Sequence, residues 1–507
     1  MLLLIPVLLP VISGSIILIK TWKKKPWRRP RFILISAIIN SAVVLGFLIA
    51  QYSEALQVTI AGSVTFRLAT DGLGTVLAGC MAVLVPLVLC YSLDFGEDRR
   101  KAEKTVQKNT LSPSDERKKR THSGKVKADP GEEKADIRKT EGKRDVFSAR
   151  MNYLFAAVTG IAFSKNAATM SFFLIILLLV DAWIVLGNGK PEKRYWIFHA
   201  GGAVAVILVL MTAVFCGRGA SFYFDGYLSG NISNQVLLIL YILGFCGCTV
   251  RKLASPFFAE EEKPENLFLD IIYAFLLIRL TFSVFGISLL RGTWAQVVVM
   301  LLSVAGIMVH SVLAFREKRF RKKMAHLSAA SFALILTGIA VMTSHGYTAA
   351  VWMTVAFAFT QLLLIFFPGA VKKKENSEGE MSAGLGRRMP VTFGCYVAAC
   401  LSVCAVPPFA GFLSVWKLAK AFTRQGGLNY LSMAAVFAFL FLAALSLYPS
   451  VAGAFFPKSD YAEKEKAEEA GPQMLVPMVV LAAAILATGL FSGVLGDYIY
   501  QIGLGLM

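Results

Sequence analysis

The stretch LSVCAVPPFAGFLSVWKLAKAF, Leu401 to Phe422, places Pro407, Pro408 and Gly411 inside an apolar run long enough to cross a membrane. Proline lacks a backbone donor, and its ring clashes with the preceding helical turn. Because lipid cannot bond the carbonyls that this leaves free, an interrupted helix persists only where protein or a polar cavity surrounds the interruption. Interrupted helices of this kind are typical of transport sites, and a simple proline kink is the alternative interpretation.

The composition of the whole chain is that of a polytopic membrane protein. Of its 507 residues 56% are apolar, and the mean hydropathy is +0.62, which excludes a soluble domain. Fourteen apolar segments are expected to form transmembrane helices, at about residues 1–19, 32–50, 72–95, 151–164, 168–187, 195–216, 234–254, 266–290, 293–315, 325–343, 348–370, 391–415, 429–452 and 473–497. The predicted fold class is an all-α membrane protein with about 14 transmembrane helices.

The distribution of basic residues predicts the orientation of these helices. The first span has no basic residue before it and a dense basic cluster after it, so we expect a retained helix with its N-terminus outside rather than a cleaved signal. With this orientation the cytoplasmic loops hold 42 Lys and Arg residues and the outer loops hold 7. The formal net charge of +20 is then explained mostly by basic residues on the cytoplasmic face, where they lie near anionic lipid. No nucleic-acid partner is expected.

Residues 96–150 stand out as a charged insert between two apolar segments. They carry 17 basic and 11 acidic side chains and almost no aromatic ones. Such a segment cannot bury a core, so we expect a disordered cytoplasmic linker or docking arm. A solvated insertion without a function of its own is the alternative.

The cysteine pattern argues against a metal or cofactor site. Eight cysteines lie within or beside apolar runs: Cys80, Cys90, Cys216, Cys246, Cys248, Cys395, Cys400 and Cys404. The closest pair, Cys246 and Cys248, has one intervening residue, which is not a metal or cluster spacing, and no second pair matches it. We therefore interpret the cysteines as packing residues and expect neither a bound metal nor a cofactor.

Two proline sites suggest that the chain contains an inverted repeat. The sequences around Pro256 and Pro408 both place Pro-Phe at or just beyond an apolar span, about 150 residues apart, in spans predicted to run in opposite directions. The corresponding division of the chain is residues 1–95 for the first three helices, 96–150 for the insert, 151–290 and 291–452 for the two repeats, and 453–507 for a loop and the last helix.

Three local motifs resemble one family of membrane proteins. They are DGLGTVLAGCMAVLVPLVLCYSLDF (Asp71 to Phe95), FRKKMAHLSAASFALILTGIA (Phe320 to Ala340) and AVPPFAGFLSVW (Ala405 to Trp416). They resemble the antiporter-like, proton-conducting subunits, which are the L, M and N subunits of bacterial complex I, the large Mrp antiporter subunits and their hydrogenase relatives. The M, N and Mrp-D types are the most similar. The resemblance implies two inverted five-helix repeats, broken helices 7 and 12, and a row of buried ionisable groups that carries protons.

The fifth helix departs from the family pattern at its acidic position. The family glutamate corresponds to Leu177, and Asp181 lies one helical turn further along the same face. Asp181 could replace that carboxylate. Alternatively, it lies near the cytoplasmic end and faces water.

The seventh and eighth helices carry arginine where the resemblance implies lysine. Arg251, with Lys252 beside it, lies five residues before Pro256, and Arg279 takes the place of the lysine in the eighth helix. An arginine stays charged, whereas a buried lysine can release its proton. An arginine at a helix centre costs about 2.5–3.5 kcal/mol, so each needs a partner. We expect Asp181 to pair with Arg251, with snorkelling to the interface as the alternative for Arg251.

The last lysine positions of the family are also altered. Val415 stands four residues after Gly411 at the expected lysine position, and Lys417 lies on a different helix face. In the eleventh helix the usual lysine falls near Thr360 and Gln361.

Two histidines lie in the second half of the chain. His326 replaces a family tyrosine and could titrate near neutral pH, but its place at a helix start among basic residues favours an interfacial role. His310 is interpreted as a packed or interfacial residue.

These features together predict an antiporter-like subunit of a complex I, Mrp or hydrogenase-type complex with degenerate conducting residues. It would have no catalytic site of its own. Expected partners are paralogous and other membrane subunits, the lipid bilayer, and protons or sodium, in a bacterial or archaeal cell membrane. The alternatives are a non-conducting scaffold or assembly subunit and a stand-alone secondary transporter.

Overall fold

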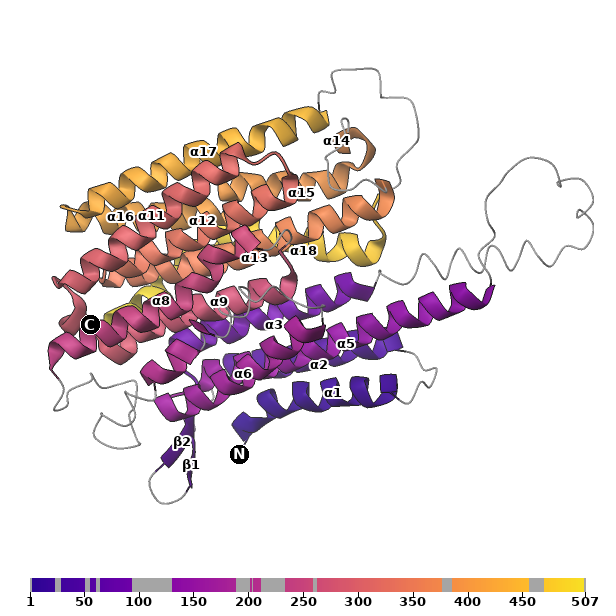
Figure 1. Ribbon diagram of the computed structural model, residues 1–507, viewed down its shortest axis with the longest axis horizontal. Helices are drawn as coiled ribbons and strands as arrows, with labels where there is room; N and C mark the ends of the chain where they lie inside the picture. Colours follow the sequence, from indigo (N-terminus) through magenta and orange to yellow (C-terminus); the bar gives the residue numbers. More distant parts are fainter. Residues whose placement is uncertain are drawn as a thin grey trace, which may run out of the picture.

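The computed structural model describes most of the chain as membrane-length helices (Figure 1). The described residues are 2–22, 29–50, 55–60, 64–93, 130–187, 201–202, 204–210, 233–258, 262–375, 385–455 and 469–505. The helices are η1 (Leu2–Leu4), α1 (Ile5–Trp22), α2 (Arg29–Ile49), α3 (Gly72–Leu93), α5 (Pro130–Phe163), α6 (Ala167–Gly187), α8 (Asn234–Phe258), α9 (Pro264–Arg279), η3 (Leu280–Phe285), α10 (Ile287–Leu290), α11 (Trp294–Arg316), α12 (Phe320–Ala340), α13 (Ser344–Glu375), α14 (Leu385–Arg388), α15 (Pro390–Val403), α16 (Ala410–Gln425), α17 (Asn429–Phe455), α18 (Pro472–Leu490) and α19 (Ser492–Gly505).

Twelve helices of the described part are long and apolar enough to cross a membrane. The chain is therefore a multi-pass membrane protein of the predicted all-α class. The predicted segment 195–216 lies largely outside the described residues. The total of 14 helices and the inverted repeats stay predictions.

Burial separates the central helices from the peripheral ones. In α13, and in the span formed by α9 and η3, 94% of an 18-residue apolar window is buried, compared with 28% of such a window in α18. The peripheral helices expose large apolar side chains, as expected for surfaces in lipid. Figure 1 shows the helices aligned side by side, with α9 and α13 in the middle. Polar groups on α9 and α13 are thus held inside protein.

A β-hairpin marks one end of the bundle (Figure 1). Its strands β1 (Leu56–Ile60) and β2 (Val64–Leu68) are antiparallel, with Leu56 opposite Leu68. The free end of α5 projects from the opposite end of the bundle. We refer to these two ends as the hairpin end and the α5 end.

The double-proline span is interrupted as its sequence predicts. Helix α15 ends at Val403, α16 begins at Ala410, and the peptide bond between Pro407 and Pro408 in the connection is cis. A side chain at Gly411 would place its Cβ 1.8 Å from the carbonyl oxygen of Ser402, so only glycine lets the two helices approach this closely.

The predicted break at Pro256 is not observed, because α8 is continuous through that residue to Phe258. Pro256 cannot donate to the carbonyl of Lys252 one turn earlier. The hydroxyl of Ser255 donates to that carbonyl instead, at 3.2 Å. The freed acceptor is therefore satisfied, and the helix needs no interruption before its last turn.

Helix α5 begins earlier than its apolar segment predicts. It starts at Pro130, a residue favoured in the first helical turn, and so includes residues 130–150 of the segment expected to be disordered. Its charged first half is rich in good helix formers. Residues 96–129 of the predicted insert lie outside the described part of the chain.

Candidate functional site

Helix α9 carries a buried ionic cluster close to the α5 end of the bundle. Asp270 accepts from Arg251 Nη1 through Oδ1 at 3.0 Å and pairs with Lys252 Nζ through Oδ2 at 2.9 Å. Lys252 also pairs with Glu262, which lies in the connection between α8 and α9. We call these four residues the Asp270 cluster. It combines two positive and two negative side chains, so the buried charges compensate one another.

Aromatic rings complete the surroundings of the two cations. The guanidinium of Arg251 lies 5.6 Å from the ring centre of Tyr273, and the ammonium of Lys252 lies 5.7 Å from that of Phe357. Such contacts stabilise a desolvated cation by about 2 kcal/mol or more. Both cations are at most 3% exposed, which excludes the snorkelling expected as the alternative for Arg251.

A second cluster lies further along α9, toward the hairpin end. Arg279 Nη2 donates to Asp71 Oδ2 at 2.6 Å, and its Nη1 donates to the carbonyl of Ser164 at 3.2 Å. Lys165 Nζ lies 3.6 Å from the same Asp71 oxygen. We call Asp71, Lys165 and Arg279 the Arg279 cluster. Nine residues of helix separate Asp270 from Arg279, a rise of about 13 Å.

The observed carboxylate partners of the two arginines, Asp71 and Asp270, were not predicted from the sequence. Asp71 opens the Asp-Gly-Leu-Gly motif, and its Oδ1 accepts the backbone N–H of Gly74 at 2.6 Å, as a residue before a helix often does. The sequence signal that could have identified both residues is an acidic side chain inside or beside an apolar span. Asp181, the expected partner of Arg251, is buried on α6 and interacts electrostatically with Tyr273. Its pairing with Arg251 stays a prediction.

The two histidines form a buried pair between α11 and α12. The Nδ1 atoms of His310 and His326 lie 3.2 Å apart, and both side chains are 3% exposed. The ring of Phe257 packs against both imidazoles, with centroid distances of 5.6 and 5.7 Å. Two nitrogens facing one another at this distance share a single proton. The pair thus lies beside the end of α8 that carries Lys252.

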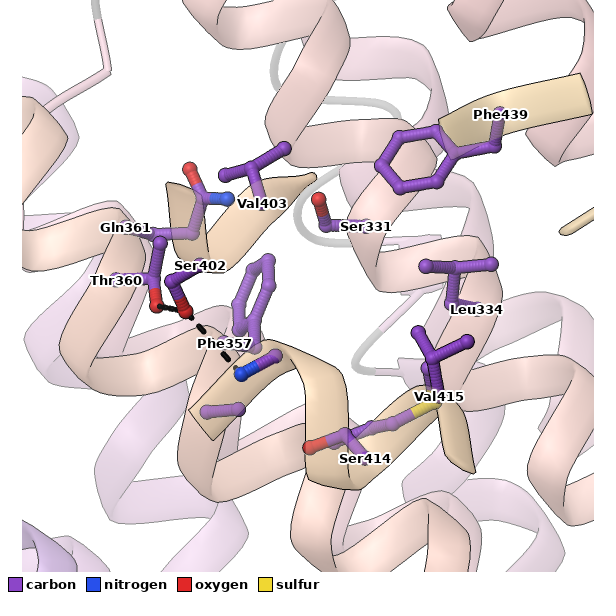
Figure 2. Close-up of a pocket in the computed structure, with 13 residues that line it drawn as sticks. Ser331, Leu334, Phe357, Thr360, Gln361, Ser402, Val403, Ser414, Val415 and Phe439 are labelled. Carbon is purple, nitrogen blue, oxygen red and sulfur yellow. Dashed lines mark hydrogen bonds between the residues drawn. The ribbon is translucent and has the colours of Figure 1, made fainter. Parts of the chain in front are cut away.

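Lys417 and Val415 point in different directions from α16, as their spacing predicts. The ammonium of Lys417 lies 5.7 Å from the ring centre of Trp352, and its charge interacts with Asp497. Val415 instead lines a cavity of about 50 Å³ beside the break between α15 and α16 (Figure 2). Thr360 and Gln361 line the same cavity. The positions in the predicted eleventh and twelfth helices at which the family resemblance implies lysines therefore meet in one place, and no charged side chain of the described residues lines it.

Comparison with known proteins supports the family resemblance. Residues 269–445 match the family described as NADH:quinone oxidoreductase/Mrp antiporter, transmembrane. NAD(P)H-quinone oxidoreductase chain 4 1 of Picosynechococcus sp. is 23% identical, over 69% of this chain and 69% of the relative. NADH-quinone oxidoreductase subunit N of Desulforudis audaxviator is 26% identical over 38% and 40%. Hydrogenase-4 component B of Escherichia coli is 22% identical over 69% and 57%.

Solved structures show the same fold. A chain of the Mrp complex from Dietzia sp. has a TM-score of 0.76 at 15% identity, with 100% of this chain and 52% of that chain covered. A chain of respiratory complex I from Thermus thermophilus has a TM-score of 0.75 at 15% identity, with both chains fully covered. The archaeal membrane-bound sulfane sulfur reductase has 0.72 at 16%, covering 98% and 77%. The predicted resemblance to antiporter-like subunits of multi-subunit membrane complexes is confirmed.

Proposed function

We propose that this chain is an antiporter-like membrane subunit that takes part in proton, or sodium/proton, translocation within a complex I, Mrp or hydrogenase-type complex. The observation that supports this most directly is the pair of buried ionic clusters on the central helix α9. Ionisable groups in a membrane interior are costly and are functional candidates for that reason.

Lys252 is the group of the Asp270 cluster best suited to release a proton, because arginine remains charged under all ordinary conditions. Burial raises the pKa of the Glu262 carboxyl above its ordinary value, although the ion pair with Lys252 opposes this. When Lys252 gives up its proton to Glu262, Asp270 keeps Arg251 as its partner. The proton can therefore move within the cluster without leaving a buried charge unpaired.

A proton that leaves or enters the Asp270 cluster changes the net charge of that cluster by one unit, and the charged groups of the Arg279 cluster respond to this change. At a separation of about 13 Å and an effective dielectric constant of about 20, a unit charge change is felt as about 1.3 kcal/mol. That is about one pKa unit, enough to couple the two clusters. Because Arg279 cannot itself release a proton, and because the second-half cavity holds no charged side chain of the described residues, we expect conduction weaker than in a lysine-bearing subunit.

The proposal includes an orientation, an organisation of the chain and a set of partners. We propose that the N-terminus and the hairpin end face outward and that the basic loop around Arg319 faces the cytoplasm, in line with the basic-residue distribution. We also propose that residues 151–290 and 291–452 form two inverted repeats. The proposed surroundings are paralogous membrane subunits and lipid, in a bacterial or archaeal membrane. The similar solved structures are those of complexes, which supports partners of this general kind.

Proton uptake into vesicles that contain the assembled complex tests the proposal. Lys252→Met removes the titratable cation but leaves the pair of Arg251 with Asp270, and we expect uptake to fall at least about tenfold. Lys318→Met is the matched control, because Lys318 is exposed between α11 and α12, and it should leave uptake unchanged. Normal uptake by an assembled Lys252→Met complex would favour the scaffold alternative.

A further inference from the structure

A small cavity lies beside the break between α15 and α16 and is separate from both ionic clusters. Its volume is about 50 Å³, and it is lined by side chains from α12, α13, α15, α16 and α17. Figure 2 shows Thr360, Gln361 and Ser402 together on one side, and Leu334, Val415 and Phe439 on the other. The cavity thus has one polar side, formed by Thr360, Gln361 and Ser402, and one apolar side, formed by Leu334, Val415 and Phe439.

The hydroxyl groups that line the cavity can each accept a further hydrogen bond. Thr360 Oγ1 and Ser402 Oγ lie 2.9 Å apart, and the backbone N–H of Gly411 points at Ser402 Oγ from 3.2 Å. Ser331 and Ser414 each donate to a carbonyl of their own helix. A hydroxyl that uses its proton in this way still has a free lone pair.

Gln361 gives an independent reason to expect a polar molecule in the cavity. Its side chain is 2% exposed and lines the cavity, and its amide makes no hydrogen bond to any other described residue. A buried amide has two donors and an acceptor that need partners. The cavity is the place from which those partners can come.

We propose that this cavity is a water-binding site that holds about three ordered water molecules, bridging the amide of Gln361 to the hydroxyls at the helix break. The volume suits this number, and a buried water needs two to four polar partners, which Gln361, Thr360, Ser402 and Ser414 supply. These waters provide hydrogen-bonding groups inside the interrupted span, although no charged side chain of the described residues lines the cavity. The inference does not depend on whether the chain conducts protons.

High-resolution electron cryomicroscopy of the full chain in its complex tests the occupancy directly. We expect at least two ordered density peaks in the cavity, with one within hydrogen-bond distance of the Gln361 amide. The map must resolve waters elsewhere in the bundle. An empty cavity in such a map, or density for a lipid acyl chain, overturns the proposal.

A pair of substitutions on α16 tests the polarity of the cavity without a map. Val415→Lys places an ammonium group among the water-binding oxygens, whereas Leu418→Lys places it at a fully buried position outside the cavity. We expect the amount of assembled Val415→Lys protein to stay within about twofold of the wild type and that of Leu418→Lys to fall at least about fivefold. Equal losses for the two variants contradict a hydrated cavity.

Discussion

The carboxylate of Asp71 and the guanidinium of Arg279 lie 2.6 Å apart, although 208 positions separate the two residues in the chain. Asp71 directly precedes α3, and Arg279 ends α9 where the π-helical turn η3 begins. The ion pair therefore connects the first helices of the chain to the centre of the bundle. A π-helical turn within a span is frequent at functional sites, which agrees with a role for Arg279 beyond packing.

Asp71→Asn should destabilise the protein strongly, because it removes the carboxylate that the buried guanidinium of Arg279 contacts at 2.6 Å. Breaking one side of a buried ion pair costs about 3–5 kcal/mol. The thermal unfolding midpoint of the purified complex measures the effect. Lys165→Met is the control, because Lys165 is the more distant and more exposed cation of the same cluster, and its loss should change the midpoint much less. Similar losses for the two variants would argue against the Asp71–Arg279 pair as the dominant contact.

Arg279→Lys should keep the positive charge but make it releasable, so we expect proton uptake by reconstituted vesicles to increase. The shorter side chain also loses the bond to the Ser164 carbonyl, which should cost about 1 kcal/mol of stability. Arg279→Ala removes the charge and should lower both uptake and assembly. If neither substitution changes uptake or assembly, Arg279 has no part in a charge relay.

Glu262 should give the protein a stability that decreases as the pH rises. Because burial raises its pKa, the folded state holds a proton that the unfolded state has already released. The free energy of unfolding therefore falls as the pH passes from the ordinary glutamate pKa through the raised one. Glu262→Gln should flatten this slope in unfolding experiments between about pH 4 and 8.

Glu317 offers a control of opposite sign in the loop between α11 and α12. Burial raises its pKa, but the backbone N–H of Arg319 and the charges of Arg319 and Lys322 together outweigh this and lower it. Stability linked to Glu317 is present above the ordinary pKa and is lost as the pH falls through the lowered one. Glu317→Gln should therefore leave the Glu262 slope intact, and a slope that disappears in both variants would contradict the assignment.

Gly411→Ala should disrupt the junction of α15 and α16. The added Cβ would meet the carbonyl oxygen of Ser402 at 1.8 Å, so the two helices must separate. We expect a loss of at least about 2 kcal/mol in unfolding free energy. Gly394→Ala is the matched control in α15, because nothing lies within 4 Å of its Cβ position. It should be neutral or slightly stabilising, since alanine favours the helix. Equal stability of the two variants would show that the close approach is unimportant.

The predictions from sequence were most accurate where a local rule governs the outcome. Each described apolar segment forms a helix, and the double proline with Gly411 interrupts its span. They were least accurate where a neighbouring side chain replaces a hydrogen bond that the local rule expects to be lost. The break expected at Pro256 is absent because Ser255 supplies the missing hydrogen bond. The face of Lys417 relative to Val415 was predicted correctly, because helical periodicity alone determines it.

The sequence by itself determined that the chain crosses the membrane many times and where its twelfth predicted span is interrupted. Hydropathy and proline act within a single segment, so these properties need no knowledge of neighbouring helices. Only the tertiary structure decided which carboxylates neutralise Arg251 and Arg279, and that Val415, Thr360 and Gln361 line one cavity. A buried charge is stabilised by whichever opposite charge packing brings within about 3 Å, and that depends on contacts between helices far apart in the chain.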